Sequence, residues 1–281
     1  MTLRHLSILP LGGLVLALAA ILVAPGGDRP FLAAATLVAA LAGLAATSIG
    51  VFGAVLVPGL LLLGVDPRFA AALSLLLQAI AIPIGASSHA AVGHVRRAIV
   101  VPLIAGGVVG AVCGALVASS VPADLIARVI ALIIVVIGCI VLANLRGGSA
   151  ASVAGPAVGP ARIGGIGLVA GLASGMSGAG WGPIGVKLLI LGRIEPRLAV
   201  GSSLVGRVAM AVAALAAYAA GAGVLGAALA SPALVAVLLG GSIATMIPGT
   251  LLIARLGRGP AAAFVAVLSI GLALPTMVGW T

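Results

Sequence analysis

The sequence has 281 residues, of which 63% are hydrophobic, 6% charged and 2% aromatic. With a mean hydropathy of +1.42, this composition excludes an ordinary soluble domain and predicts an all-α polytopic membrane protein in the lipid bilayer of the cell inner membrane. The formal net charge is +10. Its arginines are scattered through short loops, which is typical of loops kept in the cytoplasm and does not indicate a nucleic-acid partner.

The two cysteines, Cys113 and Cys139, both fall in apolar stretches. We expect them to be small hydrophobic residues buried between helices, with no disulfide. No cluster of metal-ligand residues is present in the sequence, so we expect neither a metal nor a cofactor.

The chain opens with an apolar N-terminal segment, residues 1–30. Residues 8–25 follow Arg4 and His5, and they fit either a signal peptide or a first transmembrane helix. We expect a retained helix.

The rest of the chain divides into a first repeat at residues 31–145, a linker at 146–162 and a second repeat at 163–281. The linker is rich in Gly, Pro, Ala and Ser. Each repeat opens with a long apolar stretch, 31–63 or 163–192, and about 20 residues suffice for one span. The remaining predicted helices are Phe69–Val92, Ile99–Ser119, Leu125–Asn144, Leu198–Gly221, Pro232–Ala254 and Pro260–Trp280.

Glycine interrupts the stretch Leu168–Gly192 repeatedly, and Pro183 follows the last interruption. An interior Gly costs a helix about 1 kcal/mol relative to Ala, and Pro about 3 kcal/mol. We therefore expect two half-helices that meet at a glycine elbow. The segment Ala42–Gly64 is a second copy, 128 residues earlier, with matching residues such as Gly50 and Gly178. Paired Gly/Pro-interrupted segments in two halves point to a transporter binding site.

Arginine placement favours re-entrant hairpins at these two segments. If each segment crosses the membrane once, Arg96, Arg97, Arg146 and Arg162 lie outside, against the positive-inside rule. If each is a hairpin that returns to its own side, nine loop arginines lie inside and only Arg29 and Arg68 lie outside. Each repeat then has one hairpin and three crossings. Since three is odd, we predict two inverted repeats.

The two hairpin tips should then meet near the membrane midplane. The second limbs should begin near Gly53 and Gly182, with both helix N-termini facing one central space. A helix N-terminus carries about half a positive charge and free N–H donors, which suits an anion.

Arg207 lies about ten residues into the helix predicted at Leu198–Gly221. An arginine there costs about 2.5–3.5 kcal/mol to insert, so it should face the protein interior. Its repeat equivalent, 129 residues earlier, is Gln78, and Ser74 and Ser203 are equivalent in the same way. We predict that Arg207 donates to an oxyanion. The alternative is a structural arginine that satisfies carbonyls of a broken hairpin.

Lys187 allows two interpretations, attraction of anions from the cytoplasm or extension to the inner membrane surface. The complete predicted substrate site consists of Arg207, Gln78, Ser203, Ser74, Ser177, Gly178, Gly180, Trp181, Gly182, Gly50, Val51, Phe52, Gly53 and Lys187.

All four acidic residues are predicted in loops or at helix ends, namely Asp28, Asp66, Asp124 and Glu195. We expect Asp124 to pair with Arg128, four residues later. A membrane site with positive groups and no carboxylate suits a small anionic substrate. An anion leaving a negative-inside cell gains about 2.3 kcal/mol per charge per 100 mV, so export needs no coupled ion.

Each broken segment is followed by a short charged loop and an Ala-x-x-x-Ser helix, Ala70–Ser74 or Ala199–Ser203. In this layout the chain resembles the sulfite exporter TauE/SafE family of membrane transporters over about residues 35–280. The tip glycines are better kept in the second copy, as Gly178, Gly180 and Gly182. The resemblance implies export of sulfite, of sulfonates such as sulfoacetate, or of other small anions.

Three other functions compete with export. Gly175-Met176-Ser177-Gly178 matches the GxSG motif of rhomboid proteases, but that chemistry needs a later His base and none follows His94, so we predict no enzyme. An anion channel or facilitator with the same architecture is a second alternative, and a non-transport membrane assembly protein is a third. A homo-oligomer is compatible with any of these functions.

Overall fold

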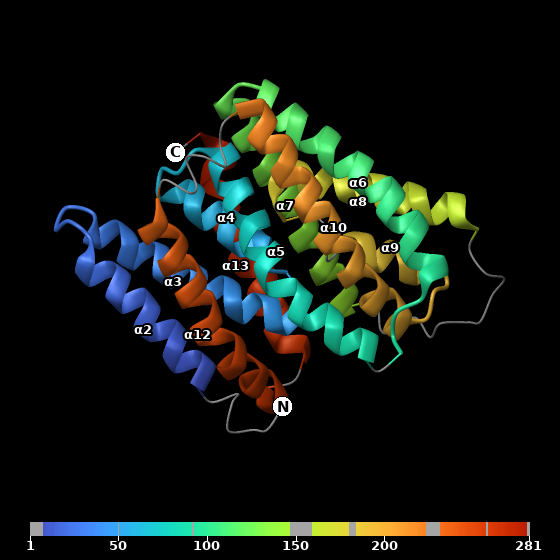
Figure 1. The fold of residues 1–281 in the computed structure, drawn as a ribbon, viewed down its shortest axis with the longest axis horizontal. Helices are drawn as coiled ribbons and strands as arrows, with labels where there is room; N and C mark the ends of the chain where they lie inside the picture. Colours follow the sequence, from blue (N-terminus) through green and yellow to red (C-terminus); the bar gives the residue numbers. More distant parts are fainter. Residues whose placement is uncertain are drawn as a thin grey trace.

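The computed structural model describes residues 8–49, 51–91, 93–146, 159–179, 184–222, 231–256 and 258–279. Every regular element within these ranges is a helix (Figure 1), which confirms the all-α prediction. The helices are α2 (Ile8–Val23), α3 (Arg29–Ile49), α4 (Gly53–Leu62), α5 (Pro67–Ala91), α6 (Arg97–Ser120), α7 (Ala123–Arg146), α8 (Pro160–Ser177), α9 (Val186–Leu191), α10 (Pro196–Ala222), α12 (Pro232–Leu256) and α13 (Arg258–Val278).

Among the described residues, four helices are long and apolar enough to cross a membrane: α3, α6, α7 and α10. Shorter apolar stretches occur in α2, α4, α5, α12 and α13. The chain is therefore a multi-pass membrane protein by composition and helix length. Length alone would also let α3 cross, although the sequence predicts it as one limb of a hairpin.

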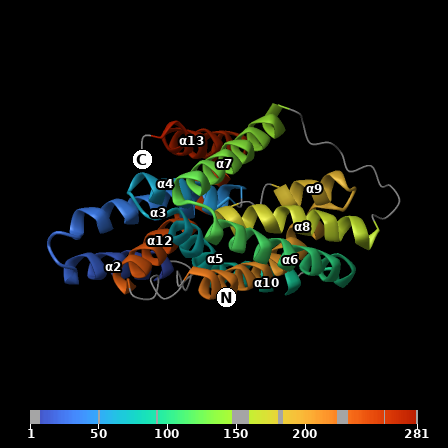
Figure 2. The ribbon, with the colours of Figure 1, turned by 90° about the horizontal axis from the view of Figure 1, so that it is seen from above.

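The short helix α4 lies at the centre of the molecule. Nine of its ten residues are buried, and α3, α5 and α13 pack around it. Figure 2 shows α7 and α13 on one side of this centre and α2, α12, α10 and α6 on the other. A helix that is apolar on all faces is stable only where other helices bury it on every side.

Two helix pairs form the most extensive contacts, α6 with α8 and α12 with α3. Glycine makes the first seam: a Cβ added to Gly106 or Gly110 would lie 1.9 Å or 2.1 Å from a carbonyl oxygen of α8. The second seam uses Gly43 in the same way, since its Cβ would lie 2.4 Å from the Ser242 carbonyl oxygen. Small residues let the backbones approach this closely.

The beginning of α8 and the beginning of α10 lie near the same end of α6. Gly164 of α8 faces Gly106, nine residues into α6. A Cβ on Gly201 of α10 would lie 2.2 Å from the His94 carbonyl oxygen, just before α6. The backbone N–H of Arg96 donates to Ser202 Oγ at 3.1 Å. The first turns of α8 and of α10 therefore both lie against the N-terminal half of α6 or the residues just before it.

Two local predictions are wrong. Cys113 and Cys139 are exposed on the outer surface of the helix bundle, where a membrane protein meets lipid, because their helices turn other residues toward the neighbouring helices. Asp124 and Arg128 do not form an ion pair; among the described residues only Arg197 and Glu195 do, at 2.7 Å. Both Asp124 and Arg128 line a pocket, described below, instead of meeting each other.

Candidate functional site

The helix α8 ends at a glycine elbow, as the sequence predicts. Gly178 follows the last helical residue with φ of 65°, in the left-handed region that favours glycine. Its N–H donates to the Ser174 carbonyl at 2.7 Å and closes the final turn. The left-handed conformation of Gly178 turns its own carbonyl away from α8.

The start of α4 lies directly against this elbow. A Cβ added to Gly53 would lie 2.1 Å from the Gly178 carbonyl oxygen and 2.8 Å from the Ala179 Cα. The two helix breaks, 125 residues apart in the sequence, are therefore in backbone contact. Val51 and Phe52, which precede α4, are buried. At the start of α4, the N–H groups of Val55 and Leu56 donate to the Phe52 carbonyl at 3.3 Å and 3.2 Å.

Two side chains of α5 bind the Gly178 carbonyl. Ser74 Oγ donates to it at 2.8 Å and Gln78 Nε2 donates to it at 2.7 Å. Gln78 Nε2 also donates to Ser74 Oγ at 3.0 Å. Ser74 and Gln78 lie one turn apart on one face of α5 and are both buried.

Arg207 of α10 completes the network. Its Nε donates to Gln78 Oε1 at 3.0 Å, and its Nη2 donates to the same oxygen. A guanidinium can only donate, so this contact fixes which end of the amide is oxygen and directs Nε2 at Gly178. The side chain of Arg207 is 7% exposed. Arg207 and Gln78 are also equivalent residues of the two predicted repeats.

Arg207 lies close to the broken helix. The guanidinium bonds Gln78, and Gln78 bonds the Gly178 carbonyl, so Arg207 lies within one side chain of the junction between the breaks. The four acidic residues all lie outside helix interiors, since Asp124, the one that is helical, is the second residue of α7. The junction therefore brings a buried guanidinium and several hydrogen-bond donors close to the two helix breaks.

A comparison with protein-family models identifies the family of the chain. A model of the sulfite exporter TauE/SafE family matches residues 35–275, most of the chain. The chain belongs to the sulfite exporter TauE/SafE family. The search of curated proteins and the search of solved structures both returned no match. TauE/SafE membership implies a membrane transporter for sulfite and related sulfur anions, and so confirms the transport prediction at that level.

Two further predicted site residues of this TauE/SafE chain, Ser203 and Ser177, bond the backbone of their own segments. The Ser203 hydroxyl donates to the Val200 carbonyl of its own helix at 2.8 Å. The Ser177 hydroxyl donates to the Ala173 carbonyl at 2.6 Å and accepts from the Ala179 N–H at 3.1 Å, so it caps α8. Lys187 is half-buried on α9. The predicted residues Gly50, Gly180, Trp181 and Gly182 lie outside the described residues.

The sequence reasoning missed Tyr218. This side chain is fully buried, and its hydroxyl donates to the Gly175 carbonyl in the last turn of α8 at 2.8 Å. It thereby supports the elbow from the α10 side. The sequence offered one signal for this contact. Tyr218 is the only tyrosine of the chain and lies far into an apolar helix, where a buried tyrosine hydroxyl usually has a hydrogen-bond partner.

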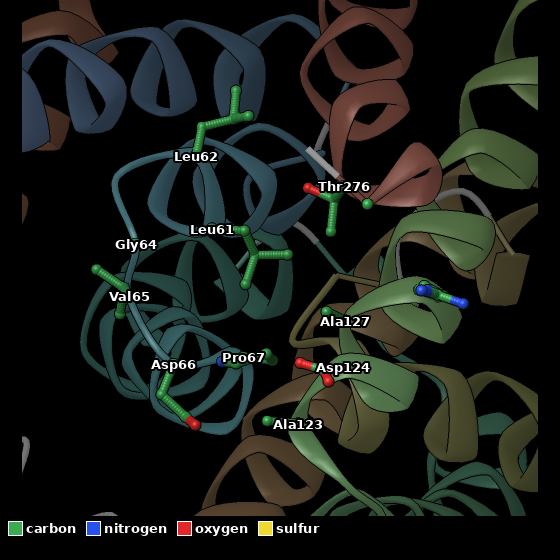
Figure 3. Close-up of a pocket in the computed structure, with 12 residues that line it drawn as sticks. Leu61, Leu62, Gly64, Val65, Asp66, Pro67, Ala123, Asp124, Ala127 and Thr276 are labelled. Atoms are coloured by element: carbon green, nitrogen blue, oxygen red, sulfur yellow. The ribbon is translucent and has the colours of Figure 1, made fainter. Parts of the chain in front are cut away.

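A pocket of about 480 Å³ lies elsewhere, where α4 ends and α5 and α7 begin (Figure 3). Its lining includes Asp66, Asp124, Arg128 and Thr276. Two carboxylates make it a poor site for an anion, and none of the predicted substrate residues of this TauE/SafE chain lines it. We therefore place the candidate site at the junction of the two helix breaks.

Proposed function

We propose that this protein exports small sulfur oxyanions, such as sulfite or a sulfonate like sulfoacetate, from the cytoplasm across the inner membrane, with the anion held near Arg207 where the two helix breaks meet. One observation carries the proposal. Arg207 is buried in the interior of a long apolar helix, beside the contact between Gly53 and Gly178. Placing an arginine at such a depth costs about 2.5–3.5 kcal/mol, which a functional site justifies.

The chemistry of the junction supports an anion. The guanidinium offers a planar fork of donors that matches an oxyanion, and the start of α4 adds backbone N–H groups and the positive end of a helix dipole. Glycine at both breaks leaves room for the backbone to approach a ligand closely. Export follows from energetics, because an anion gains about 2.3 kcal/mol per charge on leaving a cell at 100 mV, negative inside.

We further propose that α3–α4 and α8–α9 are re-entrant hairpins of two inverted repeats. The contact pattern supports this arrangement, since α6 packs on α8 as α12 packs on α3. The direct contact of Gln78 with its repeat equivalent Arg207 also supports it, because two equivalent residues meet only near the axis that relates the repeats. Alternating access would then move one repeat against the other around the junction.

The test is voltage-driven sulfite efflux from proteoliposomes that contain the full chain. We expect the wild-type protein to carry sulfite outward under an inside-negative potential, and Arg207→Gln to lose at least about tenfold in rate, as removal of one charge-assisted contact predicts. Arg207→Lys, which keeps the charge but not the fork, should retain an intermediate rate.

Arg197→Gln is the matched control, since Arg197 is exposed and pairs at the surface with Glu195; it should transport at the wild-type rate. Equal sulfite efflux in wild-type protein and Arg207→Gln would contradict the proposal.

A further inference from the structure

We propose that Gln78 selects the exported anion by competing with it for Arg207, so that an anion presenting two oxygens displaces the amide and a halide does not. This inference rests on the proposed function and adds a selectivity mechanism to it. It starts from an unusual pairing: Nε and Nη2 of Arg207, two donors in fixed geometry, both bond one neutral oxygen, Gln78 Oε1.

The Nε–Nη2 edge of a guanidinium fits two acceptor oxygens side by side. Gln78 supplies one uncharged acceptor oxygen that these two donors share. A sulfite or sulfonate group offers two charged oxygens on one side and can make two parallel bonds in place of the shared one. Because the oxyanion also carries a full negative charge, it attracts the guanidinium more strongly than the neutral amide does, and it outcompetes the amide.

A halide offers one acceptor centre to the same edge. It would replace one shared acceptor by another and gain no second bond, while it also loses its hydration in a buried site. Gln78 therefore binds Arg207 more weakly than an anion with two oxygens does, but not more weakly than an anion with a single acceptor centre. A site is selective when it opposes the wrong ligand as well as binding the right one.

Displacement of Gln78 also reaches the elbow of α8. The amide donates to the Gly178 carbonyl at 2.7 Å because Arg207 holds its oxygen end. When the anion takes the guanidinium, that orientation is no longer imposed, and Ser74 Oγ is left as the second donor to Gly178, at 2.8 Å. Anion binding thus weakens one of two side-chain bonds that join α5 to the elbow, which links occupancy of the site to movement of the helix break.

The experiment compares sulfite and chloride fluxes through the full chain in proteoliposomes, for wild-type protein and Gln78 variants. Gln78→Met keeps the side-chain length and removes the competing oxygen. We expect its sulfite-to-chloride rate ratio to fall by about tenfold or more, chiefly because chloride flux rises. Gln78→Glu places a carboxylate on the guanidinium, and we expect it to lose both fluxes.

Ser74→Ala is the matched control within the network. It removes one donor to Gly178 but keeps the Arg207–Gln78 contact, so its ratio should stay at the wild-type value even if its rate falls. Gln78→Leu repeats the test where Gln78→Met does not yield folded protein.

A wild-type ratio in Gln78→Met, with sulfite flux still dependent on Arg207, overturns this inference and leaves the proposed function standing. Sulfite flux that does not depend on Arg207 overturns both. Wild-type transport by Gln78→Glu would contradict the proposed competition for Arg207, because the protein would then transport anions equally well with the charge of the guanidinium neutralised by a carboxylate.

Discussion

At the scale of single residues, the contact between Gly53 and Gly178 determines the geometry of the candidate site. Each residue has a separate reason to be glycine. Gly178 needs φ of 65°, which costs an L-residue energy. Gly53 does not have a positive φ, but there is no space for a side chain at this position. An added Cβ would lie 2.1 Å from the Gly178 carbonyl oxygen and 2.8 Å from Ser74 Oγ.

We therefore expect Gly53→Ala to separate the two breaks and disturb the donors on Gly178. Overpacking of this kind costs about 1–3 kcal/mol, and sulfite flux should fall by about tenfold or more if the junction holds the anion. The measurement is sulfite efflux together with the thermal midpoint in detergent. Gly165→Ala is the control, because its added Cβ meets nothing within 4 Å. Wild-type flux in Gly53→Ala would show that the contact is dispensable.

The sequence predicts the members of the network better than its bonds. The repeat offset identifies Ser74, Gln78 and Arg207, and helical spacing places Ser74 and Gln78 on one face. It does not predict that Arg207 bonds Gln78, or that Ser203 bonds its own helix while its equivalent Ser74 bonds Gly178. Those differences depend on how far each helix stands from the opposite break, which is a tertiary distance that no local pattern contains.

At the scale of elements, the positions of the glycines determine which face of a helix can pack closely on a neighbour. Three glycines of α6 at spacings of four face α8, Gly106, Gly110 and Gly114, and each would clash with α8 through an added Cβ. The sequence shows this spacing, and packing of the helix on a neighbour is the ordinary expectation. The identity of the neighbour is not in the spacing, because several apolar helices of similar length could fill that position.

Helix ends test the hairpin arrangement of α8 and α9. Arg162, near the start of α8, and Arg193, just after α9, are both exposed. If the segment is re-entrant, cysteines placed at both positions should react with a membrane-impermeant thiol reagent from the cytoplasmic face only. If the segment crosses once, the two positions should react from opposite faces. The background should carry Cys113→Ala and Cys139→Ala, because both native cysteines are exposed.

At the scale of the whole molecule, charge is distributed as an anion exporter requires. The chain has 14 basic and 4 acidic residues. The acidic residues lie in loops or in the first turn of a helix, and two of them, Asp66 and Asp124, line the pocket of Figure 3. A buried guanidinium and a short central helix, α4, remain as the positive features of the interior.

The fold class and the approximate helix bounds follow from composition, hydropathy and the glycine pattern, and the family from a resemblance in the layout of the repeats. The short length of α9 does not follow from the sequence. Its six residues are fewer than the apolar stretch predicts, because the spacing of apolar residues does not show where a helix begins again after a break. Nor does the sequence reveal that nine of the ten residues of α4 are buried, which results from α3, α5 and α13 closing around it.

The most direct test of the central claim is equilibrium binding of radiolabelled sulfite to the purified full chain, with wild-type protein beside Arg207→Gln and Arg197→Gln. Binding is measured without transport, so the result depends on the site alone. The account predicts saturable binding in wild-type protein and in Arg197→Gln, and an affinity at least about tenfold lower in Arg207→Gln. Equal affinity in all three proteins would contradict it and would place the sulfite site away from the junction of the two helix breaks.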